Sequence, residues 1–294
     1  MASQQDIRRR IRSVRNTRKI TKAMELVSGA KLRKAQQRIE RLRPFADSMH
    51  DLIAEAAGRA QRSAASEPLL QRREPNRTGL VVCTGDRGLA GAFNASVLRR
   101  SLDEARDYEG SGQELVWYAV GKRGAGSLRF RGRIPVEAWT GFTDSPLYAD
   151  AEQIANRLIE EYVEDRVDRV LLVYNHFDSP LVQTVVVEQL LPVPIDELEE
   201  ITPHELALQG LLLFEPEEKD ILPDLLRTAV ETAIFRALLE STASEHGARM
   251  TAMRNASDNA NDLIDRLTLA MNRARQAEIT QEILEVVAGA DALE

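Results

Sequence analysis

The chain has 294 residues, of which 43% are hydrophobic and 29% charged, a balance typical of folded rather than disordered proteins. Aromatic residues make up only 5%, which disfavours a packed sandwich or barrel and favours helices. No apolar run reaches the roughly 18 residues that suggest a membrane span, and the first residues lack the apolar core of a secretory signal. We therefore expect no direct membrane insertion and a cytoplasmic location.

The net charge of −7 is unevenly distributed. Residues 1–43 hold 14 Lys and Arg against 3 Asp and Glu, so this arm carries +11 and the remainder −18. A basic arm on an acidic chain predicts an acidic partner, which could be nucleic acid or acidic protein loops. The arm lacks the interleaved aromatic residues on which single strands stack, and its apolar stripes favour a protein partner.

The first predicted element is one long helix from about Gln4 to Ala57. This stretch holds one proline, Pro44, and one glycine, Gly29, among good helix formers. Such a helix would span roughly 80 Å, far more than an average globular helix, so it needs support outside a compact core.

The apolar line of this helix is predicted to drift around its surface. Its three successive parts are Ile7, Ile11 and Val14; then Ile20, Met24 and Val27; then Leu32, Ala35, Ile39 and Leu42. A drifting line suits a helix whose neighbours change along its length rather than a uniform two-stranded coil.

Residues 77–196 alternate β-branched apolar runs with helical stretches. The runs and stretches, in order, are Leu80–Thr84, 94–107, Leu115–Val120, 148–165, Val170–Tyr174 and Thr184–Leu191. This order predicts a Rossmann-like α/β domain with a mainly parallel sheet, which we place at residues 76–196. Cys83 lies in the first run, and we interpret it as a buried small hydrophobe.

A second long helix, with Pro223 tolerated in its opening turns, is predicted to run to about Val287, because no proline occurs after Pro223. We expect the two terminal helices, at residues 1–60 and 216–294, to pair as an antiparallel coiled coil. The predicted heptad seam of the second helix is Met253, Ala256, Ala260, Leu263, Leu267, Ala270, Ala274, Ala277, Gln281 and Leu284. An alanine-rich seam allows close approach but buries little apolar area per layer.

Two glycine clusters, Thr84–Asn94 and Gly121–Gly126, follow strands where nucleotide folds bind phosphate. Neither fits G-x-G-x-x-G or the P-loop, so we interpret them as structural turns. The four histidines lack metal-ligand spacing, and no serine lies in a G-x-S-x-G elbow. We therefore expect no catalytic residue, metal site or cofactor.

Three separated segments carry distinctive motifs. They are Ile11–Val27 (IRSVRNTRKITKAMELV), Asp86–Asn94 (DRGLAGAFN) and Ala274–Ile283 (ARQAEITQEI), the last followed by Ala288–Ala290. In this order, and over essentially the whole chain, they resemble the gamma subunit of F-type ATP synthases. Ala90 stands where many members have Cys, and the cysteine-bearing insertion of chloroplast members is missing, so no thiol control is expected.

The resemblance implies a central rotor stalk without an active site of its own. The terminal helices would turn inside a ring of alternating alpha and beta subunits, and the α/β domain would contact the epsilon subunit and the membrane c-ring. Rotation driven by ions would then be coupled to ATP synthesis or hydrolysis in the beta subunits. The implied location is peripheral, on the cytoplasmic face of the plasma membrane within the F1 sector.

The resemblance also implies residue roles. The implied rotor–stator coupling contacts are Met24, Arg249, Arg275, Gln276, Thr280 and Glu282. The implied contacts to acidic beta-subunit loops are Arg9, Arg10, Lys19, Lys22, Lys31, Arg33 and Lys34. The implied apolar tip, which would enter a sleeve at the top of the ring, is Ile283, Leu284, Val286, Val287 and Leu293.

Two alternatives stay open at this point. A nucleotide-handling α/β enzyme would rest on the Gly85 loop alone and requires nucleotide binding by the isolated chain. A basic coiled-coil tether or nucleic-acid binder requires binding without an ATPase partner. Neither accounts for all three motif segments.

Overall fold

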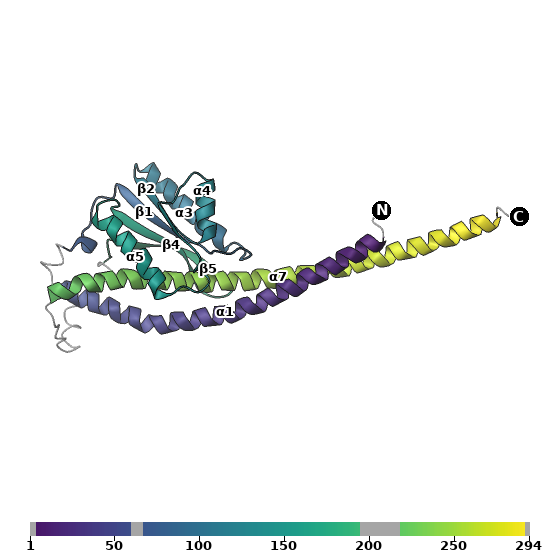
Figure 1. Cartoon of the computed structure of the whole chain (residues 1–294), viewed down its shortest axis with the longest axis horizontal. Coiled ribbons are helices and arrows are strands. Elements are labelled where there is room, and N and C mark those ends of the chain that lie inside the picture. The colour runs from purple at the N-terminus through teal and green to yellow at the C-terminus, as the bar shows by residue number, and fades with distance from the viewer. Residues whose placement is uncertain (1–3, 60–66, 195–217, 292–294) are drawn as a thin grey trace. The chain divides into compact units, whose positions relative to one another are not determined.

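The computed structural model describes residues 4–59, 67–194 and 218–291. They divide into two compact units, one made of the residues up to Ser28 with those from Arg249 onward, the other of Gly29–Ala248. Two long helices, α1 (Gln4–Arg59) and α7 (Glu218–Asp291), contribute to both units (Figure 1). These helices and the central sheet confirm the predicted fold class, while the exact domain bounds stay a prediction.

The sheet of the second unit has five strands in the order β3-β2-β1-β4-β5. Their bounds are β1 (Arg77–Cys83), β2 (Glu114–Val120), β3 (Glu137–Trp139), β4 (Arg169–Phe177) and β5 (Gln183–Leu191). The pairings among β1 to β4 are parallel, and β5 runs antiparallel to β4 at one edge. A mixed α/β sheet of this order has its ligand-binding edge at the carboxyl ends of the parallel strands.

Helices cover both faces of this sheet. On one face lie α3 (Phe93–Gly110) and α4 (Lys122–Phe130), which contribute Val97 and Leu128 to the core. On the other face lie α5 (Tyr148–Val163) and part of α7, with a short 3₁₀ turn, η1 (Pro68–Leu70), at its margin. Burial on both faces explains why the central strands read as continuous apolar runs. Cys83 is buried as predicted, and burial raises the pKa of its thiol to about 12.

The buried line of α1 does not drift as the sequence suggested. In the first unit it runs through Ile7 and Ile11 and continues on the same spacing through polar side chains. Those polar positions are Thr21, Glu25 and Ser28, all buried. Ile20 and Val27 are instead 61% and 56% exposed. The apolar side chains suggested a shifted stripe because the sequence does not reveal which polar residues find partners across the seam.

The seam of α7 also differs from the predicted one. Met253 and Ala260 are buried as expected, but Leu263 is 44% exposed. Its neighbour Ile264 is 8% exposed and packs in an apolar cluster with Ile7 and Ile11 of α1. The buried positions Met253, Ser257, Ala260 and Ile264 keep a seven-residue repeat, but its intermediate layers lie one residue later than predicted. The sequence pattern missed this phase because Ser257, which is 5% exposed, is polar.

Within the described ranges, no helix combines the length and apolarity needed to cross a membrane.

Candidate functional site

The loop between β1 and α3 lies at the carboxyl edge of the sheet, beside the point where the strand order reverses. The Asp86 carboxylate accepts hydrogen bonds there from the backbone N–H groups of Lys122 at 3.0 Å and Gly141 at 2.8 Å. It also accepts from the Thr143 hydroxyl at 3.0 Å. The Asp86 carboxylate thus occupies backbone N–H donors at the start of α4 and in the loop after β3. A bound phosphate would need these same donors. This arrangement supports the interpretation of the glycine cluster as a structural turn.

Close packing explains the glycines of this edge. A Cβ on Gly85 would lie 2.6 Å from the Glu245 carboxyl carbon of α7, and a Cβ on Gly124 would lie 2.6 Å from Thr84 Oγ1. Gly121 has φ +90° and a Cβ there would meet the Thr84 carbonyl oxygen at 2.2 Å. These positions need glycine because loops and α7 approach one another closely, not because a ligand does.

One residue of the same loop escaped the sequence analysis. Leu89 has φ +64° and a side chain that is 64% exposed. The left-handed conformation costs a leucine about 1–2 kcal/mol, and burial of the side chain does not offset it. Nothing in the sequence signals this conformation, because leucine rarely adopts it.

In the first unit, α1 and α7 are paired through polar side chains in the middle of their seam. The Thr21 and Ser257 hydroxyl oxygens lie 2.6 Å apart, and Arg18 donates to the Asn261 side-chain oxygen at 2.6 Å. Glu25 accepts from Lys22 at 3.0 Å and from Arg254 at 3.2 Å. The hydrogen bond from Lys22 outweighs burial, and with Arg254 it lowers the pKa of the Glu25 carboxyl. These partners stabilise polar groups that a uniform apolar seam would exclude.

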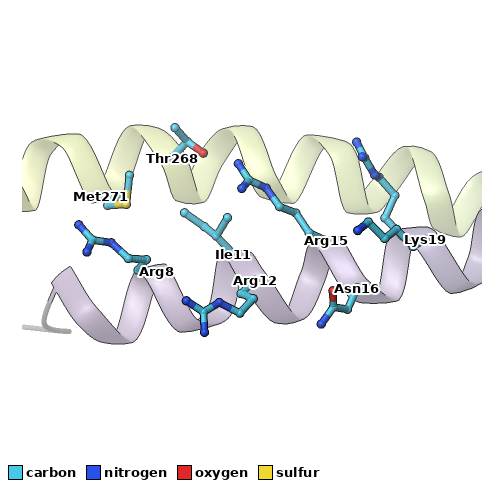
Figure 2. A pocket seen from close by; sticks show the side chains of 9 residues that line it. Arg8, Ile11, Arg12, Arg15, Asn16, Lys19, Thr268 and Met271 are labelled. Carbon is cyan, nitrogen blue, oxygen red and sulfur yellow. The ribbon is translucent and has the colours of Figure 1, made fainter.

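A basic groove runs beside this seam, with a volume of about 410 Å³ (Figure 2). Its lining residues are Arg8, Ile11, Arg12, Arg15, Asn16, Arg18 and Lys19 of α1 with Thr268 and Met271 of α7. None of these nine residues is acidic, so the groove attracts anions. Lys19 was in the implied contact set and the four arginines were not. Their helical spacing, with Arg8, Arg12, Arg15 and Lys19 on one face, is the signal that could have identified them.

The implied coupling residues fall into two groups. Met24 is half-buried, and Arg249 is 6% exposed. Arg275, Gln276, Thr280 and Glu282 are exposed and follow Ala274, which still packs against the apolar cluster of the helix pair. The Thr280 hydroxyl donates to the Gln276 carbonyl at 2.8 Å within the helix. The structure therefore presents four of the six on an exposed length of α7 rather than gathering them into one pocket.

The implied basic contacts are mostly exposed side chains. In the first unit these are Arg9, Arg10, Lys19 and Lys22, and in the second unit Arg33 and Lys34. Lys31 differs, because its ammonium group forms an ion pair with the Asp144 carboxylate, and its side chain is 36% exposed. Its charge is already compensated within the second unit.

Comparison with known proteins gives one consistent family. The family model described as ATP synthase matches residues 3–293. The ATP synthase gamma chain of Rubrobacter xylanophilus is 45% identical over 294 residues, covering 100% of this chain and 99% of the relative. That of Pelotomaculum thermopropionicum is 44% identical over 295 residues, with 100% of both chains covered.

Solved structures show a similar arrangement. A chain from the Tetrahymena thermophila mitochondrial ATP synthase, described as central stalk and c-ring, matches with a TM-score of 0.60 and 26% identity, covering 81% of this chain and 99% of that one. A chain from the Euglena gracilis mitochondrial ATP synthase matches with a TM-score of 0.57 and 17% identity, covering 90% and 95%. The second likeness concerns the fold alone.

Proposed function

The chain belongs to the ATP synthase gamma chain family, and from that premise we propose that it is the central rotor stalk of an F-type ATP synthase. It couples ion-driven rotation of a membrane ring to ATP synthesis or hydrolysis in a ring of alpha and beta subunits. The observation that carries this proposal is the first unit, where a narrow seam joins two helices and leaves cations and large apolar side chains exposed. Exposed groups that differ around a shaft can contact otherwise equal subunits differently, and only differential contact shifts their states.

We place catalysis in the beta subunits and no active site in this chain. The support is the sheet edge, where Asp86 holds the backbone N–H groups of Lys122 and Gly141 that a nucleotide phosphate would use. Glu245 adds a second carboxyl group against Gly85. Two carboxyl groups at this edge oppose the binding of a phosphate anion.

The proposed partners are the F1 alpha and beta subunits, the epsilon subunit and the membrane c-ring. The Tetrahymena neighbour, described as central stalk and c-ring, supports the last of these. In this assignment the chain is a peripheral membrane protein of the F1 sector on the cytoplasmic face of the plasma membrane.

The rotor–stator hydrogen bonds are assigned to Arg275, Gln276, Thr280 and Glu282, with Met24 and Arg249 as further coupling residues. Exposure of the four α7 side chains supports this role. The apolar tip has support of the same kind, because Ile283, Leu284 and Val286 are 57%, 63% and 73% exposed. The side chains of Val287 and Leu293 lie outside the described residues.

The contacts to acidic beta-subunit loops are assigned to exposed cations. They are Arg9, Arg10, Lys19, Lys22, Arg33 and Lys34, together with Arg8, Arg12 and Arg15 of the basic groove. An exposed ion pair contributes only about 0–1 kcal/mol, so such contacts can break and form again at each step of rotation. Lys31 and Lys22 of the implied set already have partners within the chain, Asp144 and Glu25, and Lys22 is the more exposed of the two.

Reconstitution with purified alpha and beta subunits of the same source tests the proposal. We expect a stoichiometric complex by size-exclusion chromatography, with cooperative ATPase activity. Gln276→Ala, or truncation after Glu282, should lower that activity, for the single substitution by about twofold to tenfold, the factor for one lost hydrogen bond. Asn259→Ala, which removes another exposed amide from α7, is the control and should have little effect.

Failure to join the alpha–beta ring would contradict the rotor assignment. ATP binding by the isolated chain would favour the enzyme alternative, and tight nucleic-acid binding would favour the tether.

A further inference from the structure

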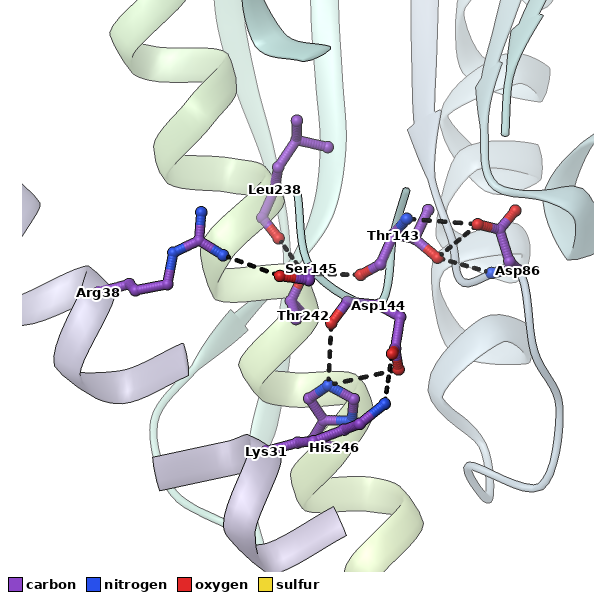
Figure 3. Close-up of polar contacts among 9 residues, drawn as sticks. All are labelled: Lys31, Arg38, Asp86, Thr143, Asp144, Ser145, Leu238, Thr242 and His246. Carbon is purple, nitrogen blue, oxygen red and sulfur yellow. Dashed lines mark hydrogen bonds and ion pairs between the residues drawn. The ribbon is translucent and has the colours of Figure 1, made fainter. Parts of the chain in front are cut away.

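In the second unit, the loop between β3 and α5, residues 140–147, contacts both long helices (Figure 3). From α1, Lys31 pairs with the Asp144 carboxylate, and Arg38 donates to the Pro146 carbonyl. From α7, the Thr242 hydroxyl shares its one hydrogen between the Thr143 carbonyl at 2.9 Å and the Leu238 carbonyl of its own helix at 2.7 Å. The His246 ring nitrogen Nε2 lies 3.4 Å from the Asp144 carbonyl. One short loop thus joins two helices that are far apart in sequence.

Each helix contacts the loop at two places. Lys31 and Arg38 are seven residues apart on α1, which is two turns and therefore one face. Thr242 and His246 are four residues apart on α7 and also share a face. A single contact would act as a pivot, whereas two contacts separated along a helix resist rolling of that helix against the loop.

The loop is equally tied to the sheet. Asp86 Oδ2 accepts hydrogen bonds from the Gly141 N–H at 2.8 Å and the Thr143 hydroxyl at 3.0 Å. The Thr143 hydroxyl in turn accepts from the Asp86 N–H at 2.9 Å. Thr143 is therefore held on both sides, by Asp86 of the β1–α3 loop and by Thr242 of α7.

The charges around Asp144 favour its ion pair with Lys31. Burial alone would raise the pKa of this carboxyl group, but the hydrogen bond and charge of Lys31 outweigh it, with smaller contributions from His246 and Arg87, so the pKa is lowered. The carboxylate stays ionised and able to pair with Lys31. The His246 side chain, 2% exposed, supports the loop from α7.

We propose that Thr143 and Asp144 form a clamp through which the α/β domain grips both shaft helices and passes torque to them, with Asp144 as a positioning residue. This inference rests on the proposed rotor function. If the α/β domain receives rotation from the membrane ring, the clamp transmits it to α1 and α7 together. ATP hydrolysis by a soluble complex with alpha and beta subunits needs the helices but not this transmission, so the two activities separate.

A matched pair of substitutions tests the clamp. Asp144→Asn removes the ion pair to α1, whose side chains are 36% and 33% exposed. Glu109→Gln removes the Arg133–Glu109 pair, whose side chains are both 35% exposed and which lies wholly within the α/β domain. The two variants lose comparable ion pairs, and only one of them joins the domain to a helix.

Three measurements are made on each variant. They are ATPase activity of the soluble complex, ion-driven ATP synthesis by the whole synthase in vesicles, and hydrogen exchange of backbone amides 142–145 in the chain alone. For Asp144→Asn we expect soluble ATPase to stay within about twofold, while the ratio of synthesis to hydrolysis falls, and amide exchange rises, by about twofold to fivefold, the factor for an exposed ion pair. Glu109→Gln should leave both the ratio and the exchange unchanged.

Equal losses of coupling in the two variants, or an unchanged ratio in Asp144→Asn, would overturn the proposal. Arg38→Met removes the other contact of α1 to the loop, the hydrogen bond to the Pro146 carbonyl, and keeps the test valid if Asp144→Asn folds poorly. If the unmodified chain does not assemble, the rotor function fails and the torque role with it. Hydrogen exchange in the isolated chain then still decides whether the clamp holds the loop.

Discussion

Thr21 of α1 and Ser257 of α7 face each other across the seam of the helix pair, with their hydroxyl oxygens 2.6 Å apart. Both residues are buried, at 8% and 5% exposure. The pair occupies a layer of the seam where a regular coiled coil has apolar side chains. The Thr21 hydroxyl also lies 3.1 Å from the Arg18 carbonyl, so it can donate there while it accepts from Ser257. The layer thus fixes the register of the two helices without adding a large apolar area.

Replacing one member of this pair should destabilise the chain more than replacing both. Thr21→Val leaves the Ser257 hydroxyl without this partner in a buried seam, and we expect a loss of about 1 kcal/mol in the free energy of unfolding. The double variant Thr21→Val with Ser257→Ala should lose less than the sum of the two single variants. Denaturant unfolding followed by circular dichroism measures this. Thr17→Val, at an exposed position of α1, is the control, and strictly additive losses would contradict the prediction.

The observed seam of α7 predicts unequal effects of two adjacent truncations. Ile264→Ala removes a side chain that is 8% exposed and packs against Ile7 and Ile11, so it should cost about 2 kcal/mol or more. Leu263→Ala removes a side chain that is 44% exposed and should cost less than about 1 kcal/mol. Thermal and denaturant unfolding compare them directly. A larger loss for Leu263→Ala would mean that the seam follows the heptad expected from the sequence.

The hydrogen bonds that Asp86 accepts predict that the stability of the chain depends on its negative charge and on both of its carboxylate oxygens. Asp86→Ala leaves the N–H groups of Lys122 and Gly141 without their acceptor, at a cost of about 1–3 kcal/mol. Asp86→Asn should also destabilise, because an amide NH₂ placed against these N–H donors cannot accept their hydrogen bonds. Denaturant unfolding compares these variants with Asp107→Asn, an exposed carboxylate of α3. The prediction fails if Asp86→Asn is as stable as that control.

The lowered pKa of Asp144 predicts a pH dependence with a defined sign. The ordinary pKa of this group is 3.8, and in the folded chain it is lower, chiefly because Lys31 outweighs the effect of burial. Its contribution to stability is therefore present above pH 3.8 and is lost as the pH falls through the folded pKa. The difference in unfolding free energy between the unmodified chain and Asp144→Asn should shrink as the pH falls below about 4. A difference that grows on acidification would contradict the assignment.

The sequence predicted the elements more accurately than the contacts between them. The helical stretches near 94–107 and 148–165 correspond to α3 and α5, because local composition and spacing determine such segments. The short helix α4 was missed, since its two glycines, Gly124 and Gly126, oppose a helical assignment. Glycine is needed at position 124 in spite of its low helix propensity, because the Thr84 side chain packs where a Cβ would lie.

By itself, the sequence determined two long helices, a central α/β domain and the family, because helix propensity, strand patterning and ordered motifs are written in local residue order. It did not determine which side chains of those helices are buried. Glu25 and Ser28 lie in the seam while Ile20 and Val27 are exposed, and Lys31 pairs with Asp144, more than a hundred residues away. Only the tertiary structure decides these matters, because the free energy of burying a polar group depends on the partner that it meets.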